Sequence, residues 1–192
     1  NDSAFVDIGH DIKGGDQLLV INTDRSGLNI AYKLGLADGQ CVGDLGVSHA
    51  ISDIAASGGI PKCISVALLL PPETKRHFVL EVMKGAEAAA TRYGTAIVCG
   101  DTKQNPKFAM VVTAVGTVAR SNRLTRSGAK PGDLMVVTGY LGTMLLGTIA
   151  YRRQQDVQDT IRSILKEAMI HQNPPFQLGR TLAEARRSPD LP

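Results

Sequence analysis

The sequence has few of the residues that mark several easily recognised protein classes. Aromatic residues make up 4% of the 192 positions and tryptophan is absent, which leaves few flat surfaces on which nucleic-acid bases could stack. The net charge of +3 comes from basic residues that are spread along the chain rather than gathered in one patch. We therefore expect no nucleic-acid partner.

Long apolar runs and paired cysteines are also missing. No segment approaches the roughly 20 apolar residues that cross a bilayer, and the opening Asn1-Asp2-Ser3 begins no basic and apolar export signal, so we expect a cytoplasmic protein without a membrane partner. Cys41, Cys63 and Cys99 form no Cys-x-x-Cys pair, which indicates neither a zinc site nor a disulfide framework. Cys63 and Cys99 lie in apolar stretches, where we expect them to be buried.

The spacing of the apolar residues predicts an α+β fold. A glycine-rich turn at residues 14–16 is typical of a hairpin between the first two expected strands. The order of the elements favours a largely antiparallel sheet with helices on one face. The expected strands cover residues 4–8, 17–22, 62–70, 96–99, 108–118 and 134–138, and the expected helices cover residues 42–57, 73–92 and 157–169.

A change in composition predicts a domain boundary. Residues 119–133 are rich in Arg, Ser, Asn, Gly and Pro and have no apolar period. We therefore expect a first domain over residues 1–119, followed at residues 120–192 by part of a second, α/β domain.

Three short strings place an aspartate at the end of an expected strand or inside an expected helix. They are Asn22-Thr23-Asp24, Ile51-Ser52-Asp53 and Gly100-Asp101-Thr102. Mg²⁺ prefers carboxylate, hydroxyl and water oxygens and usually binds together with substrate phosphates, so convergence of the three aspartates would favour an ATP-using enzyme. Alternatively, these residues are ordinary turn formers, whose side chains bond their own backbone. Asp53 favours the first interpretation, because a carboxylate in an apolar helix is costly unless it is paired or metal-bound.

Four segments together resemble a known family. Asn22–Asp24, Ser52–Pro61, Gly100–Thr102 and Leu124–Asp133 are similar, in that order, to the marks of the thiamine-monophosphate kinases, and more broadly to the AIR synthase-related superfamily. The resemblance continues to residues 171–175. It implies an AIR synthase-like N-terminal domain and a homodimer whose sheets pair, with ATP and several Mg²⁺ ions near the interface.

The resemblance also implies roles for individual residues. The implied Mg²⁺ ligands are Asp2, Thr23, Asp24, Asp53 and Asp101, and the implied ATP contacts are Gly100, Asp101, Thr102 and Arg126. Asp24, Asp53 and Asp101 form the implied catalytic set, since phosphoryl transfer needs positioning and charge neutralisation more than a covalent nucleophile. Arg126 has a planar fork of donors suited to phosphate, although an arginine in a loop is ordinarily solvated. The four histidines have no paired metal-ligand spacing and receive no role.

Our leading hypothesis is an ATP- and Mg²⁺-dependent phosphotransferase that passes the γ-phosphoryl group to a small phosphorylated metabolite. A second hypothesis keeps the ATP site but ends in ring closure or dehydration through a phosphorylated intermediate. A third is a nucleotide-binding dimerisation module without catalysis.

Overall fold

The computed structural model describes residues 3–7 and 16–185, and a five-stranded sheet with the order β1-β2-β5-β3-β4 forms its centre. Strands β3 and β4 are parallel, whereas the other neighbouring pairs are antiparallel, which confirms the predicted largely antiparallel sheet. The strands are β1 (Ala4–Val6), β2 (Gln17–Ser26), β3 (Ile60–Leu70), β4 (Ile97–Gln104) and β5 (Ala109–Ala119).

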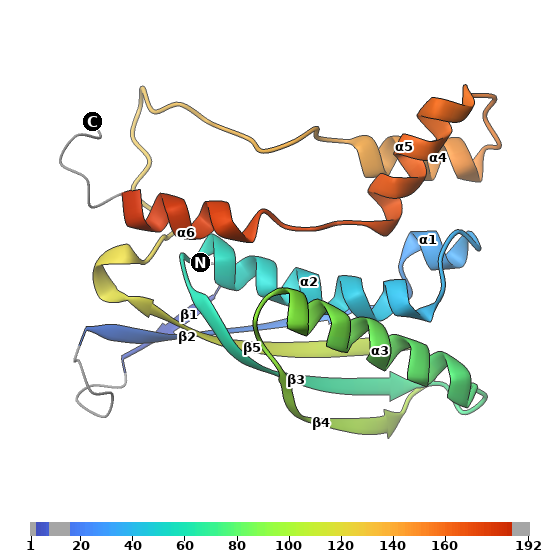
Figure 1. Ribbon diagram of the computed structural model, residues 1–192, viewed down its shortest axis with the longest axis horizontal. Helices are drawn as coiled ribbons and strands as arrows, with labels where there is room; N and C mark the ends of the chain where they lie inside the picture. The colour runs from blue at the N-terminus through green and yellow to red at the C-terminus, as the bar shows by residue number, and fades with distance from the viewer. Residues whose placement is uncertain (1–2, 8–15, 186–192) are drawn as a thin grey trace.

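The helices lie on one side of the sheet, as predicted (Figure 1). Helices α2 (Gly39–Ala56) and α3 (Arg76–Arg92) cover the sheet directly, and α6 (Phe176–Ala185) runs along α2 in a further layer (Figure 1). The remaining helices are α1 (Ile30–Lys33), the 3₁₀ turn η2 (Arg120–Asn122), α4 (Thr143–Arg152) and α5 (Asp159–Ile170). None of the helices in the described part has both the length and the apolar composition needed to cross a bilayer.

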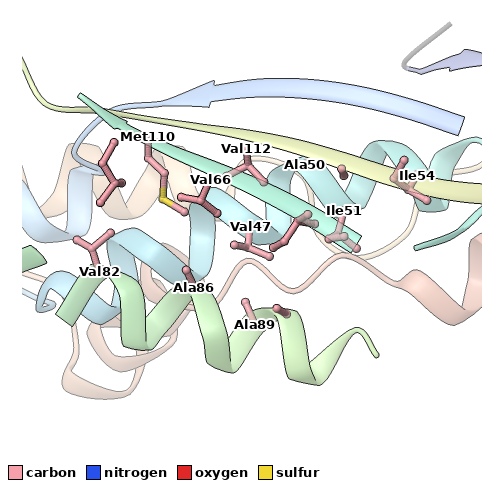
Figure 2. Packing of buried hydrophobic residues seen from close by; sticks show 14 of the residues in the cluster. Val47, Ala50, Ile51, Ile54, Val66, Val82, Ala86, Ala89, Met110 and Val112 are labelled. Carbon is pink, nitrogen blue, oxygen red and sulfur yellow. The ribbon is translucent and has the colours of Figure 1, made fainter. Parts of the chain in front are cut away.

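The core fills the space between α2, α3 and the covered face of the sheet. Figure 2 shows apolar side chains of α2, such as Val47 and Ile51, between the sheet and α3. Val66 and Val112 meet them from the sheet, because strand residues alternate between faces and only one face is covered. Burial of α2 between two layers explains why its sequence is apolar on more than one side.

Helix α2 begins at a well-formed cap. The Asp38 carboxylate accepts hydrogen bonds from the backbone N–H groups of Gln40 and Cys41, at 3.0 and 3.3 Å, which satisfies donors that have no partner within the helix. The helix predicted over residues 42–57 is confirmed and starts three residues earlier than its apolar pattern indicated.

Two strands extend further than predicted. Strand β2 continues to Ser26 and β4 continues to Gln104, so Asp24 and Asp101 lie inside strands and not after their ends. The apolar stretch around Cys99 is not buried, because β4 is the edge strand and nearly all of it is exposed. For the same reason Cys99 is exposed, contrary to the prediction. Cys63 is also not buried, but half-buried, because it lies on the uncovered face of the sheet.

The predicted helix over residues 157–169 is confirmed as α5, but the strand predicted over residues 134–138 is wrong. Residues 134–138 are irregular, and Met135 is 95% exposed. An isolated apolar segment does not form a strand in water, because its backbone groups need a neighbouring strand, and the described residues supply none there.

Candidate functional site

Asp24 on β2 and Asp53 near the C-terminal end of α2 lie within electrostatic reach of each other. In β2, Asp24 lies on the face that also carries the buried residues Leu18, Val20 and Asn22, and this is the face that α2 covers. Burial raises the pKa of the Asp53 carboxyl, and the negative charge of Asp24 raises it further. The two carboxylates are therefore electrostatically coupled, and the Asp53 side chain is partly desolvated.

Two other groups lower the pKa of Asp53 in part. They are the charge of His49, one helical turn earlier on α2, and a hydrogen bond from the Asn22 side chain. The Asn22 amide also donates to the carbonyl oxygen of Ala50 at 3.3 Å, which ties β2 to α2 beside the two aspartates.

The backbone of Asp53 is held from two sides. Its carbonyl oxygen accepts hydrogen bonds from the hydroxyls of Ser3, at 3.1 Å, and Ser57, at 2.9 Å. The carboxylate of Asp24 accepts from the N–H of Arg25 at 2.7 Å. These contacts fix the backbone of Asp53 and one oxygen of the Asp24 carboxylate.

The pair suits a magnesium ion that arrives with phosphates. In the described part of the chain, His, Cys, Asp and Glu nowhere gather in a group of three or more that could hold a metal ion. Mg²⁺ does not require such a group, because it commonly binds one or two carboxylates and completes its shell with water and substrate phosphates. Asp24 and Asp53 are two carboxylates of the kind that such an ion binds.

Thr23 points away from Asp24. Its hydroxyl lies 3.0 Å from that of Thr113, its register partner on β5, and both side chains lie on the uncovered face of the sheet. Neighbouring strand residues face opposite sides, so the Thr23 hydroxyl and the Asp24 carboxylate do not meet at one point.

Asp101 does not join the other two aspartates within one chain. Its register partner on β3 is Ala67, between the buried residues Val66 and Leu68, so the Asp101 side chain lies on the uncovered face. Strand β4 is three strands away from β2, which separates Asp101 from Asp24 by roughly 14 Å. The predicted convergence of all three carboxylates is therefore wrong for a single chain, since it needs a common face that the register does not supply.

Gly100 and Thr102 border a hollow of about 610 Å³ at the exposed edge of the sheet. The apolar side chains of Val79 and Met83 from α3 line its other side. Packing also explains why residue 100 is a glycine, because a Cβ atom there would lie 2.0 Å from the carbonyl oxygen of Val66. The backbone N–H of Thr102 donates to the Asp101 carboxylate at 2.8 Å.

The structure places Arg126 in the exposed linker after η2. Two residues earlier, the N–H of Leu124 donates to the carbonyl oxygen of Ser57 at 3.1 Å, so the start of this linker is anchored at the end of α2 that carries Asp53. Asp2 lies outside the described residues.

His49 is a candidate that the sequence analysis missed. Its ring nitrogen Nε2 lies 3.2 Å from Oε1 of Gln172, in the segment between α5 and α6. The signal in the sequence was its position four residues before Asp53, which puts the two side chains on one side of a helix. A search for paired metal-ligand spacing among histidines could not reveal it.

Comparisons with known proteins agree on one family. The model of the family described as AIR synthase related protein, N-terminal domain, matches residues 1–118. A thiamine-monophosphate kinase from Methanospirillum hungatei is 36% identical over 129 residues, which are 67% of this chain and 44% of that protein. The thiamine-monophosphate kinase of Bacillus subtilis is 29% identical, over 97% of this chain and 59% of its own length.

Solved structures share the fold. The structure of AaThiL complexed with AMPPCP and TMP superimposes with a TM-score of 0.81 at 22% identity and covers 96% of this chain and 57% of its own. The chain thus spans about half the length of the relatives that it matches. This likeness confirms the predicted AIR synthase-like α+β fold.

Proposed function

Because this chain belongs to the AIR synthase related protein family, we propose that it forms the metal- and nucleotide-binding part of an ATP- and Mg²⁺-dependent phosphotransferase. The observation that carries the proposal is the electrostatic coupling of Asp24 on β2 to the partly buried Asp53 on α2, whose backbone is held by Ser3 and Ser57. Two carboxylates that repel each other destabilise the metal-free protein, so a site of this kind is best explained by a cation that binds there.

Mg²⁺, when bound, neutralises the negative charge of the phosphates that approach it. The role of Asp24 and Asp53 would be to bind the ion between β2 and α2. In the proposed reaction an oxygen of the acceptor forms a bond to the γ-phosphorus of ATP. The bond from that phosphorus to the β–γ bridging oxygen breaks, and ADP leaves with the electron pair.

We propose that the hollow beside Gly100 and Thr102 receives the base of the nucleotide. Its walls are apolar side chains of α3 and the sheet, which suit the flat face of a purine. Strand β4 is the edge of the sheet, so backbone N–H and C=O groups on its outer side are available to the edge of a base.

The acceptor that we propose is a small phosphorylated metabolite of the thiamine monophosphate type. Proteins named thiamine-monophosphate kinase match this chain over most of its length.

The test is to supply the intact natural protein with ATP, Mg²⁺ and thiamine monophosphate and to follow the products by phosphorus NMR. We expect ADP and a new diphosphate ester, with no product in the presence of a chelator. ATP turnover without a phosphorylated product would favour ring closure or dehydration, and binding without turnover would favour a non-catalytic module.

We further propose that the protein is a homodimer that pairs the uncovered faces of its sheets. This face carries half-buried apolar side chains, whereas the free face of an antiparallel sheet is ordinarily polar. The apolar residues on it include Leu19, Ile21, Leu69, Val111 and Val115. Asp101 lies on the same face of the edge strand β4, so in such a dimer its carboxylate would face the partner copy, and we propose that it reaches the partner's site around the edge of the sheet.

Mixing two inactive variants tests the role of Asp101 across the dimer. Random exchange between Asp53→Asn and Asp101→Asn homodimers makes half of the dimers mixed, each with one intact site, so about one quarter of the wild-type activity should return. The matched control mixes Asp53→Asn with Asp24→Asn, which lie in the same chain's site and should restore nothing. Absence of recovery in the first mixture would show that Asp101 does not act across the dimer.

We propose that residues 1–119 are one domain and that residues 120–192 begin a second. The family match ends at residue 118, and the exposed apolar residues Leu134, Met135 and Val136 are typical of a segment that packs against a further surface.

A further inference from the structure

Side chains on the uncovered face of the sheet form rows that cross its strands. One row, which we call the charged row, runs from β4 over β3 and β5 to β2 through positions that are register partners. Its members are Asp101, Ala67, Val111 and Arg25. Three strand spacings separate its two ends by roughly 14 Å, so the opposite charges of Asp101 and Arg25 are too far apart to pair within one chain.

Both charged ends of this row are available to a partner. Arg25 and Asp101 are exposed, and none of the ion pairs between described side chains includes either of them. The Asp101 carboxylate accepts the N–H of Thr102 with Oδ1, at 2.8 Å, which leaves Oδ2 for another donor. The planar fork of an arginine suits a carboxylate well. Each end therefore lacks, within the described chain, the kind of group that the other end offers.

The neighbouring rows on this face differ from the charged row in chemistry. The next row along the strands is polar and consists of Cys99, Ser65, Thr113 and Thr23. The row after it is apolar and contains Cys63, Val115 and Ile21. Along the strands, the uncovered face thus changes from charged to polar to apolar.

This order of rows distinguishes between two ways of packing a second copy on the face. A two-fold axis that runs along the strands, between β5 and β3, keeps each row opposite the same row of the partner and exchanges its ends. Arg25 then faces the partner's Asp101, while polar side chains face polar ones and apolar side chains face apolar ones. An axis that runs across the strands places Arg25 opposite the partner's Ile21 or the partner's Arg25, according to the row through which it passes. The charge is then left unpaired or repelled.

The contact is within reach of the two side chains. Sheets that pack face to face lie about 10 Å apart and keep their strands within about 30° of each other, so an extended arginine and an aspartate can bridge them. Among the described residues, β1 pairs only with residues 19–21 of β2, so no described strand lies beside Arg25 on the outer side of β2. A carboxylate held at Arg25 is therefore at the free side of the strand segment that carries Asp24.

We propose that Arg25 is a positioning residue whose guanidinium binds the carboxylate of the partner's Asp101 and thereby sets the register of the dimer. By symmetry the contact forms twice in each dimer. The inference rests on the proposed homodimer and adds the direction of its axis and the contact that aligns the two copies. A second role for Asp101 at the metal site is compatible with it, because carboxylates that bind a metal ion are themselves hydrogen-bonded by further groups.

Complementary charge reversals in the intact natural protein test this contact. In Arg25→Glu and in Asp101→Lys homodimers, like charges would meet twice, so each variant alone should dimerise at least about 100-fold more weakly than the wild type. In a mixture of the two variants, opposite charges meet at both contacts, so heterodimers should form with an affinity within about tenfold of the wild type. Sedimentation velocity measures the affinities, and native mass spectrometry identifies the heterodimer. The matched control is Arg76→Glu, an exposed arginine of α3 on the covered side of the sheet, which should dimerise like the wild type.

The mixture separates a contact between chains from damage within one chain, because each chain keeps its own substitution when the partner is added. A mixture that stays monomeric, or single variants that dimerise like the wild type, would overturn the inference. Neither result bears on the phosphotransferase activity, which phosphorus NMR follows in the wild type. A wild type that phosphorylates thiamine monophosphate as a monomer would overturn both the dimer and this inference but would leave the proposed activity intact.

Discussion

Helix α2 carries two carboxylates with opposite surroundings. At Asp44, near its start, both carboxylate oxygens accept hydrogen bonds from Nη2 of Arg92 on α3, each at 2.7 Å, and the Ser48 hydroxyl adds a third at 3.2 Å. At Asp53, near its end, the neighbouring group is a second carboxylate, Asp24. The fold thus neutralises one acidic group with its own arginine, whereas the other has a like charge within electrostatic reach.

This difference shows how a carboxylate that stabilises helix packing is distinguished from one that is proposed to bind a ligand. Asp44 and Arg92 attract each other across the α2–α3 contact and stabilise the packing of two helices. The charge of Asp24 disfavours ionisation of Asp53, which is the position where we propose that a cation binds. Substitutions at the two ends of α2 should therefore change different properties.

The largest effect is expected from Asp53→Asn. Groups that merely support metal ligands already alter metal affinity 10- to 100-fold, so loss of the carboxylate itself should weaken Mg²⁺-dependent nucleotide binding by at least about 100-fold. Isothermal titration calorimetry on the intact natural protein measures this affinity. Asp44→Asn is the control and should bind the nucleotide normally. If both variants bind with wild-type affinity, Asp53 is not part of the metal site.

Gly179→Ala probes the cover over the Asp53 end of α2. A Cβ atom at residue 179 would lie 2.3 Å from the carbonyl oxygen of Ala55, so α6 could not keep its close contact with α2. We expect a loss of about 1–3 kcal/mol in the free energy of unfolding, measured with urea. Gly27→Ala is the matched control, because the contact nearest to its Cβ would be 3.9 Å away. Equal stability of the two variants would show that α6 does not pack as described.

A smaller effect is expected at the other end of the helix. The side chains of Arg92 and Asp44 are 40% and 25% exposed, so solvent screens their attraction. A double-mutant cycle with Asp44→Ala and Arg92→Ala should give a coupling free energy of about 0.5–1 kcal/mol. Nucleotide affinity should stay unchanged in all three variants. A coupling of zero would remove the stabilising role that we assign to Asp44.

The sequence predicted much of the fold because the relevant signals are local. The apolar period of α2 and the alternation in β3 and β5 reflect burial of one face, which each segment encodes by itself. The segment at residues 134–138 is apolar like β3 and β5, but no strand lies beside it among the described residues. The strand predicted there from its composition is therefore wrong. Pairing is a property of two segments, and a single segment cannot reveal it.

The same limit applies to the candidate site. The proximity of Asp24 and Asp53 follows from an alternation in β2 and a helix laid on that face, both of which are partly visible in the sequence. The position of Asp101 depends on the strand order, which puts β5 and β3 between β2 and β4. His49 and Gln172 meet only because the chain returns over α2 after α5, and no local pattern encodes that return.

The smallest effect, and the one that most directly tests the contrast between Asp44 and Asp53, is the pH dependence of stability. Burial and the charge of Asp24 raise the pKa of Asp53 in the folded protein above its ordinary value near 4, so the folded state takes up a proton more readily than the unfolded state. Stability due to this group is therefore fully present below the ordinary pKa and is lost as the pH rises through the raised pKa. In the presence of a chelator, lowering the pH from 7 towards 4 should raise the Tm of the wild type relative to Asp53→Asn.

Mg²⁺ added at pH 7 should also raise the Tm of the wild type relative to Asp53→Asn, because a bound cation would offset the negative charges as a proton does at low pH. Asp44→Asn is the control: lowering the pH should not raise the Tm of the wild type relative to this variant. A Tm difference between wild type and Asp53→Asn that is constant with pH would mean that Asp24 and Asp53 do not repel each other in the folded protein.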